Sequence, residues 1–106
     1  MAKEKNYIYI LECNDKTYYT GWTNNLENRI LNHNSKKGAK YTKNRIPCFL
    51  IYFETFDNKI DAMKREYEIK TFSRKEKENL ISTFIGVRKK KILDEINDKV
   101  RMITNE

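Results

Sequence analysis

The feature that most constrains the fold is a pair of strand-like runs joined by a short turn near the start of the chain. The first run, NYIYILEC over Asn6–Cys13, and the second, TYYTGW over Thr17–Trp22, are rich in β-branched and aromatic residues. The three residues between them, Asn14-Asp15-Lys16, have the composition of a turn. The sequence therefore predicts an antiparallel β-hairpin.

The length of the hairpin loop decides which side chains share a face of the sheet. Side chains alternate along a strand, and directly paired residues share a face. A three-residue loop places Gly21 opposite Tyr9, and it puts Tyr9 and Tyr19 on the same face. A two-residue loop of Asp15 and Lys16 would put the tyrosines on opposite faces unless a bulge intervened. We predict the three-residue register, in which the glycine leaves space beside the Tyr9 phenol.

A third strand and four helices are expected after the hairpin. Pro47 precedes a strand over residues 48–55, and Gly86 separates the third helix from a last helix over residues 88–103. Capping residues mark where the first three helices begin, and Ser73 opens a capping-box pattern with Glu76. The expected caps are Asn24 or Asn25, Asp57 or Asn58, and Ser73.

Apolar residues at helical spacing indicate which helix faces would reach the core. The stripes expected to face inward are Leu26, Ile30 and Leu31; Ile60, Met63 and Tyr67; Leu80 and Ile81; and Ile92, Ile96, Val100 and Ile103. The element order is ββαβααα, without an internal repeat. It predicts an α/β (α+β) fold with a three-stranded, mainly antiparallel sheet flanked by helices.

Charge and composition narrow the class of protein. The chain has 106 residues and a net charge of +7, which favours polyanions such as nucleic acid. It has no apolar run long enough to cross a membrane, and the polar start at Met1–Asn6 is no secretory signal, so a cytoplasmic location is expected. Cys13 and Cys48 lie in strand-like runs and are interpreted as buried free thiols.

Five dispersed residues offer the groups that phosphodiester hydrolysis needs: Tyr9, Tyr19, Arg29, His33 and Glu66. A carboxylate can hold a divalent metal, a guanidinium can bind phosphate with two donors, and a phenol and an imidazole can pass protons. Each residue also has an ordinary structural interpretation. The tyrosines fit any sheet, Arg29 and His33 fit a solvated helix face, and Glu66 can pair with Lys70 one turn on.

As an ordered set, these residues resemble the GIY-YIG family of metal-dependent nucleases. YIY at positions 7–9 and YTG at 19–21 are similar to the paired motif that names the family. Arg29 and His33 follow at the family's spacing, and Glu66 falls in the later helix that carries the family's metal-binding glutamate. The loop NSKKGAKYTKNRIP resembles that of the family's small stand-alone bacterial branch. The resemblance covers about residues 6–81.

The resemblance implies a role for each residue. Tyr9 would be the general base or orient the attacking water, and Tyr19 would be linked to metal-bound water. Arg29 would hold the scissile phosphate, and His33 would be a proton-relay partner. Glu66 would be the sole protein ligand of one Mg²⁺ or Mn²⁺. Residues 1–83 would form the nuclease domain, with residues 84–106 a basic helix packed on it or extending it.

The chain departs from the family pattern at three places. Tyr7 stands where the first motif has glycine, and Trp22 stands where some relatives have lysine. Asn79 is only a candidate for an asparagine that some relatives use. The altered first motif favours an alternative, a nucleic-acid-binding module on the same fold without useful activity. Retention of all five side chains favours a divalent-metal-dependent endonuclease. A protein adaptor using the last helix is disfavoured by the charge.

A basic loop between the first helix and the third strand is the expected contact for nucleic acid. It surrounds an aromatic residue with cations, which suits stacking and phosphate contacts with single-stranded or branched DNA or RNA. The alternative is a solubilising loop. The basic run over residues 88–91 could also bind phosphate or be a solvated charge run, and no signal for an oligomeric state is present. The predicted contact residues of the loop are Lys36, Lys37, Lys40, Tyr41, Lys43 and Arg45.

Overall fold

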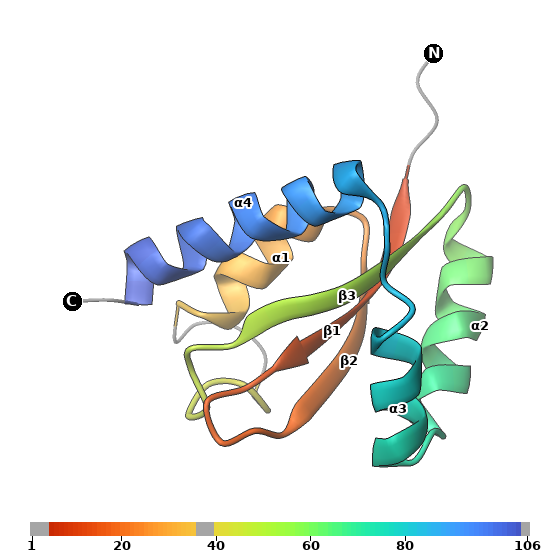
Figure 1. The fold of residues 1–106 in the computed structure, drawn as a ribbon, viewed down its shortest axis with the longest axis horizontal. Coiled ribbons are helices and arrows are strands. Elements are labelled where there is room, and N and C mark those ends of the chain that lie inside the picture. Colours follow the sequence, from red (N-terminus) through yellow and green to blue (C-terminus); the bar gives the residue numbers. More distant parts are fainter. Residues whose placement is uncertain (1–4, 36–39, 105–106) are drawn as a thin grey trace.

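The computed structural model describes residues 5–35 and 40–104, which form one three-stranded antiparallel sheet with helices on both faces (Figure 1). The element order ββαβααα and the α+β class are as predicted. The elements are β1 (Asn6–Glu12), β2 (Tyr18–Thr23), α1 (Leu26–His33), β3 (Phe49–Phe56), α2 (Lys59–Lys70), α3 (Arg74–Ile81) and α4 (Val87–Thr104).

The hairpin has the predicted three-residue register. The Cys13 amide donates to the Thr17 carbonyl at 2.9 Å, and the Lys16 amide donates to the Cys13 carbonyl at 2.9 Å. Lys16 has a φ of 69°, the left-handed conformation that closes this kind of loop. Tyr9 therefore lies opposite Gly21, and the tyrosine at position 19 lies opposite Leu11.

Strand β1 is the centre of the sheet, because the strand order is β2-β1-β3. Strand β3 pairs with it antiparallel and places Phe53 opposite Tyr9. The register between β1 and β3 shifts between Ile10 and Leu11, which marks a bulge. Both edges of β1 are thus paired, and its side chains reach both faces of the sheet.

Two hydrophobic cores lie on the two faces of the sheet. Tyr9 and Leu11 belong to the core that includes Ile30 of α1 and Ile96 of α4. Ile8 and its neighbours belong to the other core, under α2 and α3. Figure 1 shows this arrangement, with α1 and α4 on one side of the sheet and α2 and α3 on the other. The tyrosine face of β1 is therefore covered by α1 and α4.

The prediction of which face of α2 points inward is wrong. Ile60, Met63 and Tyr67 are exposed, by 66%, 47% and 76%. The buried residues of this helix are Ala62 and Ile69, which contact the core of Ile8 and Ile10. The inward stripe combines Ala62 with Ile69, and the small alanine lets the helix approach the sheet closely. The more hydrophobic stripe faces outward.

The stripe of α4 is only partly as expected. Ile96 and Val100 are buried, whereas Ile92 and Ile103 are 40% and 45% exposed. Leu93 and Asn97 complete the buried face together with the two inner residues. These four positions repeat at three- and four-residue intervals, as the buried face of a helix does. Leu93 and a polar asparagine therefore stand in this face in place of the two expected isoleucines, Ile92 and Ile103.

The helix starts agree with the capping residues in the sequence. The side chain of Asn25 accepts a hydrogen bond from the Asn28 amide, and that of Asn58 accepts one from the Asp61 amide. Ser73 and Glu76 form the reciprocal capping box of α3. After α3, Gly86 has a φ of +115°, a conformation that favours glycine, and α4 begins at the next residue.

Asn97 attaches α4 to the outer edge of β3. Its side-chain oxygen accepts from the Leu50 amide at 2.8 Å, and its side-chain nitrogen donates to the Leu50 carbonyl at 2.8 Å. Both backbone groups of Leu50 are thereby satisfied by one side chain. Asn34 makes the equivalent pair with Cys48 at the start of β3.

Two further expectations concern the cysteines and membranes. Cys13 and Cys48 are buried free thiols, as predicted. In the part of the chain that the structure describes, none of the helices has the length and apolar character needed to cross a bilayer.

Replacing Asn97 tests whether α4 is part of the cooperative fold. Asn97→Leu leaves the amide and carbonyl of Leu50 without partners, so we expect the free energy of unfolding to fall by about 2–4 kcal/mol in urea titrations. Lys91→Leu, on the exposed side of the same helix, is the control and should change it by less than about 0.5 kcal/mol. Equal stability of the Asn97 variant and the native chain would contradict this account.

Candidate active site

A buried hydrogen bond between Tyr9 and His33 lies at the centre of the candidate site. The Tyr9 Oη and the His33 Nε2 are 2.7 Å apart, although the residues are 24 positions apart in the chain. Tyr9 comes from the central strand and His33 from the last turn of α1. Both side chains are almost fully buried. The paired register and the packing of α1 on this face bring them together.

Thr42 forms a hydrogen bond with the other nitrogen of the His33 imidazole. Its Oγ1 lies 2.8 Å from the His33 Nδ1, and the threonine is fully buried. A neutral imidazole has one donor and one acceptor nitrogen. The Tyr9 phenol is the more acidic of the two hydroxyls, so we assign it as the donor to Nε2, which makes Nδ1 the donor to Thr42. His33 Nε2 is then an oriented proton acceptor.

The same burial acts on the two partners in opposite directions. Burial, together with a smaller effect of the Arg29 charge, lowers the pKa of His33 to about 4. Burial also raises the pKa of Tyr9 well above its usual range, and the Arg29 guanidinium only partly offsets that effect. Both groups are therefore neutral at pH 7, with the proton on the phenol.

Tyr19 completes an aromatic cluster around His33. Its ring lies 5.0 Å from the imidazole and 6.4 Å from the Tyr9 ring, measured between centroids. The centroid of the Tyr41 ring lies 5.4 Å from that of the Tyr19 ring. Tyr19 is only half-buried, so part of this residue is accessible to solvent.

Arg29 lies on α1, one turn before His33, and is half-buried. Its position on the same helix face explains why its charge lowers the pKa of both Tyr9 and His33. A cation beside two neutral proton-carrying groups suits an anionic ligand, because the ligand would compensate this charge.

Glu66 comes from α2, which contacts both β1 and β2. Its charge is the smallest of the effects that raise the pKa of Tyr9, after burial and the charge of Tyr19. It is 21% exposed and forms an ion pair with the Lys70 Nζ at 3.3 Å. The structural interpretation of Glu66 as a partner of Lys70 is thus present, and a role in metal binding stays a prediction.

An adjacent ion pair fixes the turn of α2 that carries Glu66. Arg65 donates from Nε and Nη2 to the two carboxylate oxygens of Glu54, each at 2.9 Å. Tyr52 also donates to Glu54. This bidentate ion pair joins α2 to β3 and restricts the rotation of the helix.

The glycine opposite Tyr9 provides the space that its phenol occupies. A Cβ atom at Gly21 would lie 2.5 Å from the Tyr9 Oη and 2.6 Å from Cζ. Such distances exclude any side chain unless the ring moves. The expected role of this glycine is therefore confirmed, and it arises from close approach rather than from an unusual φ.

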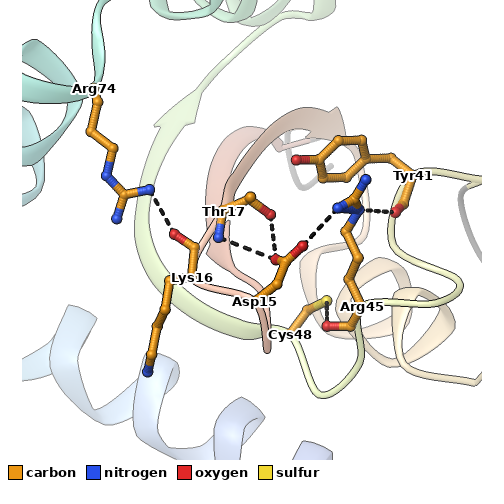
Figure 2. Close-up of polar contacts among 7 residues, drawn as sticks. All are labelled: Asp15, Lys16, Thr17, Tyr41, Arg45, Cys48 and Arg74. Carbon is orange, nitrogen blue, oxygen red and sulfur yellow. Dashed lines mark hydrogen bonds and ion pairs between the residues drawn. The ribbon is translucent and has the colours of Figure 1, made fainter.

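The hairpin turn holds the basic loop in place (Figure 2). Asp15 accepts hydrogen bonds from the amide and hydroxyl of Thr17, at 3.2 and 2.6 Å, and from the Arg45 Nη1 at 2.7 Å. The Arg45 Nε donates to the Tyr41 carbonyl, and the guanidinium lies 4.3 Å from the centre of the Tyr41 ring. This contact orients Tyr41 toward Tyr19.

The predicted nucleic-acid contacts differ in their surroundings. Lys36 and Lys37 lie outside the described residues. Lys40 and Lys43 are exposed. Tyr41 is 38% exposed and packs on Tyr19, while the Arg45 charge is already paired with the hairpin turn. None of these contacts is tested by the fold, so all remain predictions.

Two residues of the site are missing from the sequence-based set. Thr42, the partner of His33, lies in a loop without periodicity, so no pattern marks it. Asp15 was assigned to the turn only, although its side chain connects the turn to Arg45. An aspartate followed two residues later by threonine is a signal for a local side-chain turn, but not for the distant arginine.

Comparisons with known proteins agree with this arrangement. Residues 5–79 match the family model of the GIY-YIG catalytic domain. The chain is 57% identical over 77 residues to a UPF0213 protein of Staphylococcus haemolyticus, covering 73% of this chain and 94% of that protein. It is 58% identical over 78 residues to one of Clostridium perfringens, covering 74% and 84%. The solution NMR structure of a UPF0213 protein from Bacillus halodurans is similar, with 46% identity and a TM-score of 0.52, over 79% and 89%.

The close contact at Gly21 predicts a large effect of a single methyl group. Gly21→Ala should displace the Tyr9 ring and lower the free energy of unfolding by about 1–3 kcal/mol, measured by urea titration. In the double variant with Tyr9→Leu the alanine no longer meets the ring, so the two effects should not add. Additive effects would show that the ring and the glycine are independent.

The buried imidazole predicts a pH-dependent stability. The folded chain holds the pKa of His33 at about 4, and unfolding returns it to about 6.5. Between these values only the unfolded state binds the proton, so stability falls as the pH is lowered from 6.5 toward 4. We expect a loss of about 2 kcal/mol from this group between pH 7 and pH 5 in urea titrations.

His33→Gln keeps one donor and one acceptor but does not titrate, and His33 is the single histidine of the chain. This variant should lose most of the pH dependence over that interval. The same dependence in the variant and the native chain would contradict a buried neutral imidazole.

Proposed function

This chain belongs to the GIY-YIG catalytic domain family, and we propose that it hydrolyses phosphodiester bonds in nucleic acid with one divalent metal ion. A GIY-YIG catalytic domain implies a nuclease-type function. The observation that carries the proposal is the buried contact of 2.7 Å between Tyr9 and His33, with Arg29 beside it. In this contact the Tyr9 phenol can donate its proton to an oriented base.

Tyr9 and His33 act as a relay in this proposal. In the proposed step a water molecule attacks phosphorus, and the bond between phosphorus and the leaving oxygen breaks, so that this oxygen departs with the bonding electron pair. The water would give its proton to the Tyr9 Oη as the phenol passes its own proton to the His33 Nε2. The relay avoids a free phenolate, which the raised pKa of Tyr9 disfavours. The relay also requires the neutral state of His33, because only the neutral imidazole can accept the proton.

Arg29 binds the scissile phosphate in this proposal. A guanidinium can donate two parallel hydrogen bonds to phosphate oxygens. The bound anion would offset the charge that lowers the pKa of His33. Substrate binding would therefore raise the basicity of His33 when a base is needed. Tyr19, which is half-buried and packs on His33, would bind a water molecule near the phosphate in this proposal.

Glu66 is the proposed ligand of the metal ion. The carboxylate is partly exposed, and its oxygen atoms fit a hard cation such as Mg²⁺ or Mn²⁺. Mg²⁺ commonly binds through one carboxylate, several waters and substrate phosphates. When bound, it would stabilise negative charge on the leaving oxygen. Lys70 must then release Glu66.

The altered first motif does not argue against activity. Tyr7 lies within a regular strand, and in the described residues only Lys16 and Gly86 have a positive φ. The backbone at position 7 therefore has no need for glycine. The ring of Tyr7 packs edge-to-face on Phe53 at 6.2 Å, so it is accommodated without disturbing Tyr9. This observation favours the enzyme over an inactive binding module.

We also propose that Lys40, Lys43 and Tyr41 contact the nucleic acid next to the site. The lysines are exposed, and the ring of Tyr41 follows that of Tyr19 outward from the site. An aromatic ring beside cations suits a single-stranded or branched region of DNA or RNA. A cytoplasmic location remains the expectation from the sequence.

Glu66→Gln tests the metal-dependent reaction. The native chain should cleave at least one substrate in a panel of single-stranded, duplex and branched DNA and RNA when Mg²⁺ is present, and none in EDTA. Glu66→Gln should abolish cleavage while binding and thermal stability remain close to native. The matched control is Glu78→Gln, which removes a similar i,i+4 ion pair, with Arg74, on α3.

Lys70→Gln provides a second measurement on the same carboxylate. It frees Glu66 from a surface ion pair worth about 0.2–1 kcal/mol. The Mg²⁺ concentration for half-maximal cleavage should therefore fall by a factor of about two to five. Cleavage by Glu66→Gln at the native rate would refute the metal site, and an inactive native chain would favour the binding module.

A further inference from the structure

A cavity lies at the start of α1, at the end of that helix opposite His33. Its volume is about 530 Å³, and the first residues of β1, α1 and α4 form its walls. These three element starts lie together at the top of Figure 1. The cavity is on the tyrosine face of the sheet, because Tyr7 and Phe53 form its floor.

The floor of this cavity is apolar and aromatic. Tyr7 is half-buried and presents part of its ring, while Phe53 supports it edge-to-face at 6.2 Å. Ile92 of α4, 40% exposed, forms a side wall. Such a surface can take up the flat face of a nucleobase, and aromatic stacking of this kind tolerates any base.

The rim of this cavity carries a positive excess. Lys5, Arg88 and Lys89 line it and are exposed. Of its two acidic residues, Glu27 is paired with the Lys99 Nζ at 2.8 Å, which leaves Glu95. The lining cations therefore outnumber the acidic charge that remains available, so the rim suits a phosphate.

We propose that this cavity binds one nucleotide of a single-stranded segment, with its base on Tyr7 and its phosphate between Arg88 and Lys89. The proposal rests on the proposed function, since it extends the path of the same nucleic acid. Helix α1 connects the two sites, with its first residue, Leu26, in the cavity and His33 in the relay. Its 8 residues span about 12 Å, the length of a few nucleotides.

The cavity depends on the segment beyond the matched domain. The GIY-YIG match ends at residue 79, whereas Arg88, Lys89 and Ile92 belong to α4. Removing α4 would leave Tyr7 and Phe53 without the basic wall. The proposed subsite is therefore an addition to the catalytic domain rather than a part of it, and it gives the basic start of α4 a function.

The test compares two double variants of the same helix. Arg88→Gln with Lys89→Gln removes two charges that line the cavity. Lys90→Gln with Lys91→Gln removes two charges that do not line it. Binding of a short single-stranded oligonucleotide, as DNA and as RNA, is measured by fluorescence anisotropy in EDTA at several salt concentrations, so that cleavage plays no part.

We expect the first variant to bind the preferred oligonucleotide about tenfold more weakly and the second to bind close to native. The slope of log affinity against log salt should decrease by about 0.7 only in the first variant, because one phosphate is bound there and each phosphate neutralised on a single strand contributes about 0.7. Equal losses in the two variants would overturn the subsite but not the nuclease. Absence of binding by the native chain would overturn the proposed function itself.

Stacking on Tyr7 has a separate readout. An oligonucleotide that carries 2-aminopurine should lose fluorescence on binding when the base stacks on the ring. Tyr7→Phe keeps the ring and should keep the quenching, whereas Tyr7→Val keeps the strand propensity and should lose it. Quenching that is unchanged in Tyr7→Val would overturn the placement of the base, whatever the result with the lysine and arginine variants.

Discussion

The register of one hairpin is the constraint on which the candidate site depends. Lys16, at positive φ, closes a three-residue loop, and this loop puts the side chain of Tyr9 over a glycine. With any other residue at position 21 the phenol could not take its place beside His33. The position of α1 matters only after that register is set, since the helix supplies the imidazole that the phenol meets.

The site combines two buried side chains, Tyr9 and His33, with a half-buried cation, Arg29. Burial keeps both the phenol and the imidazole neutral, and Arg29 opposes protonation of the imidazole. Burial is the larger of the two causes that lower the pKa of His33, and the charge of Arg29 adds to it. An anion bound at Arg29 would remove the second cause and would therefore make the imidazole easier to protonate.

Local signals in the sequence were sufficient for the hairpin, the helix caps and the element order. Loop length fixes register, and caps act over three residues, so both can be read from neighbouring positions. The inward face of α2 could not be predicted, because Ala62 and Arg65 gain their places from a close approach to the sheet and from Glu54. Thr42 and the contact between Asp15 and Arg45 depend on how a loop folds back, which no periodicity encodes.

The side-chain amide of Asn97 also affects whether the chain associates with other copies in a concentrated solution. Strand β3 is an outer strand, and unpaired backbone groups on such a strand can template the addition of a strand from another molecule. At Leu50 both groups are occupied by the asparagine, and α4 contacts β3. Loss of this one side chain would therefore free one amide and one carbonyl on this edge for pairing with another molecule, so the altered chain would be more prone to associate as its concentration rises.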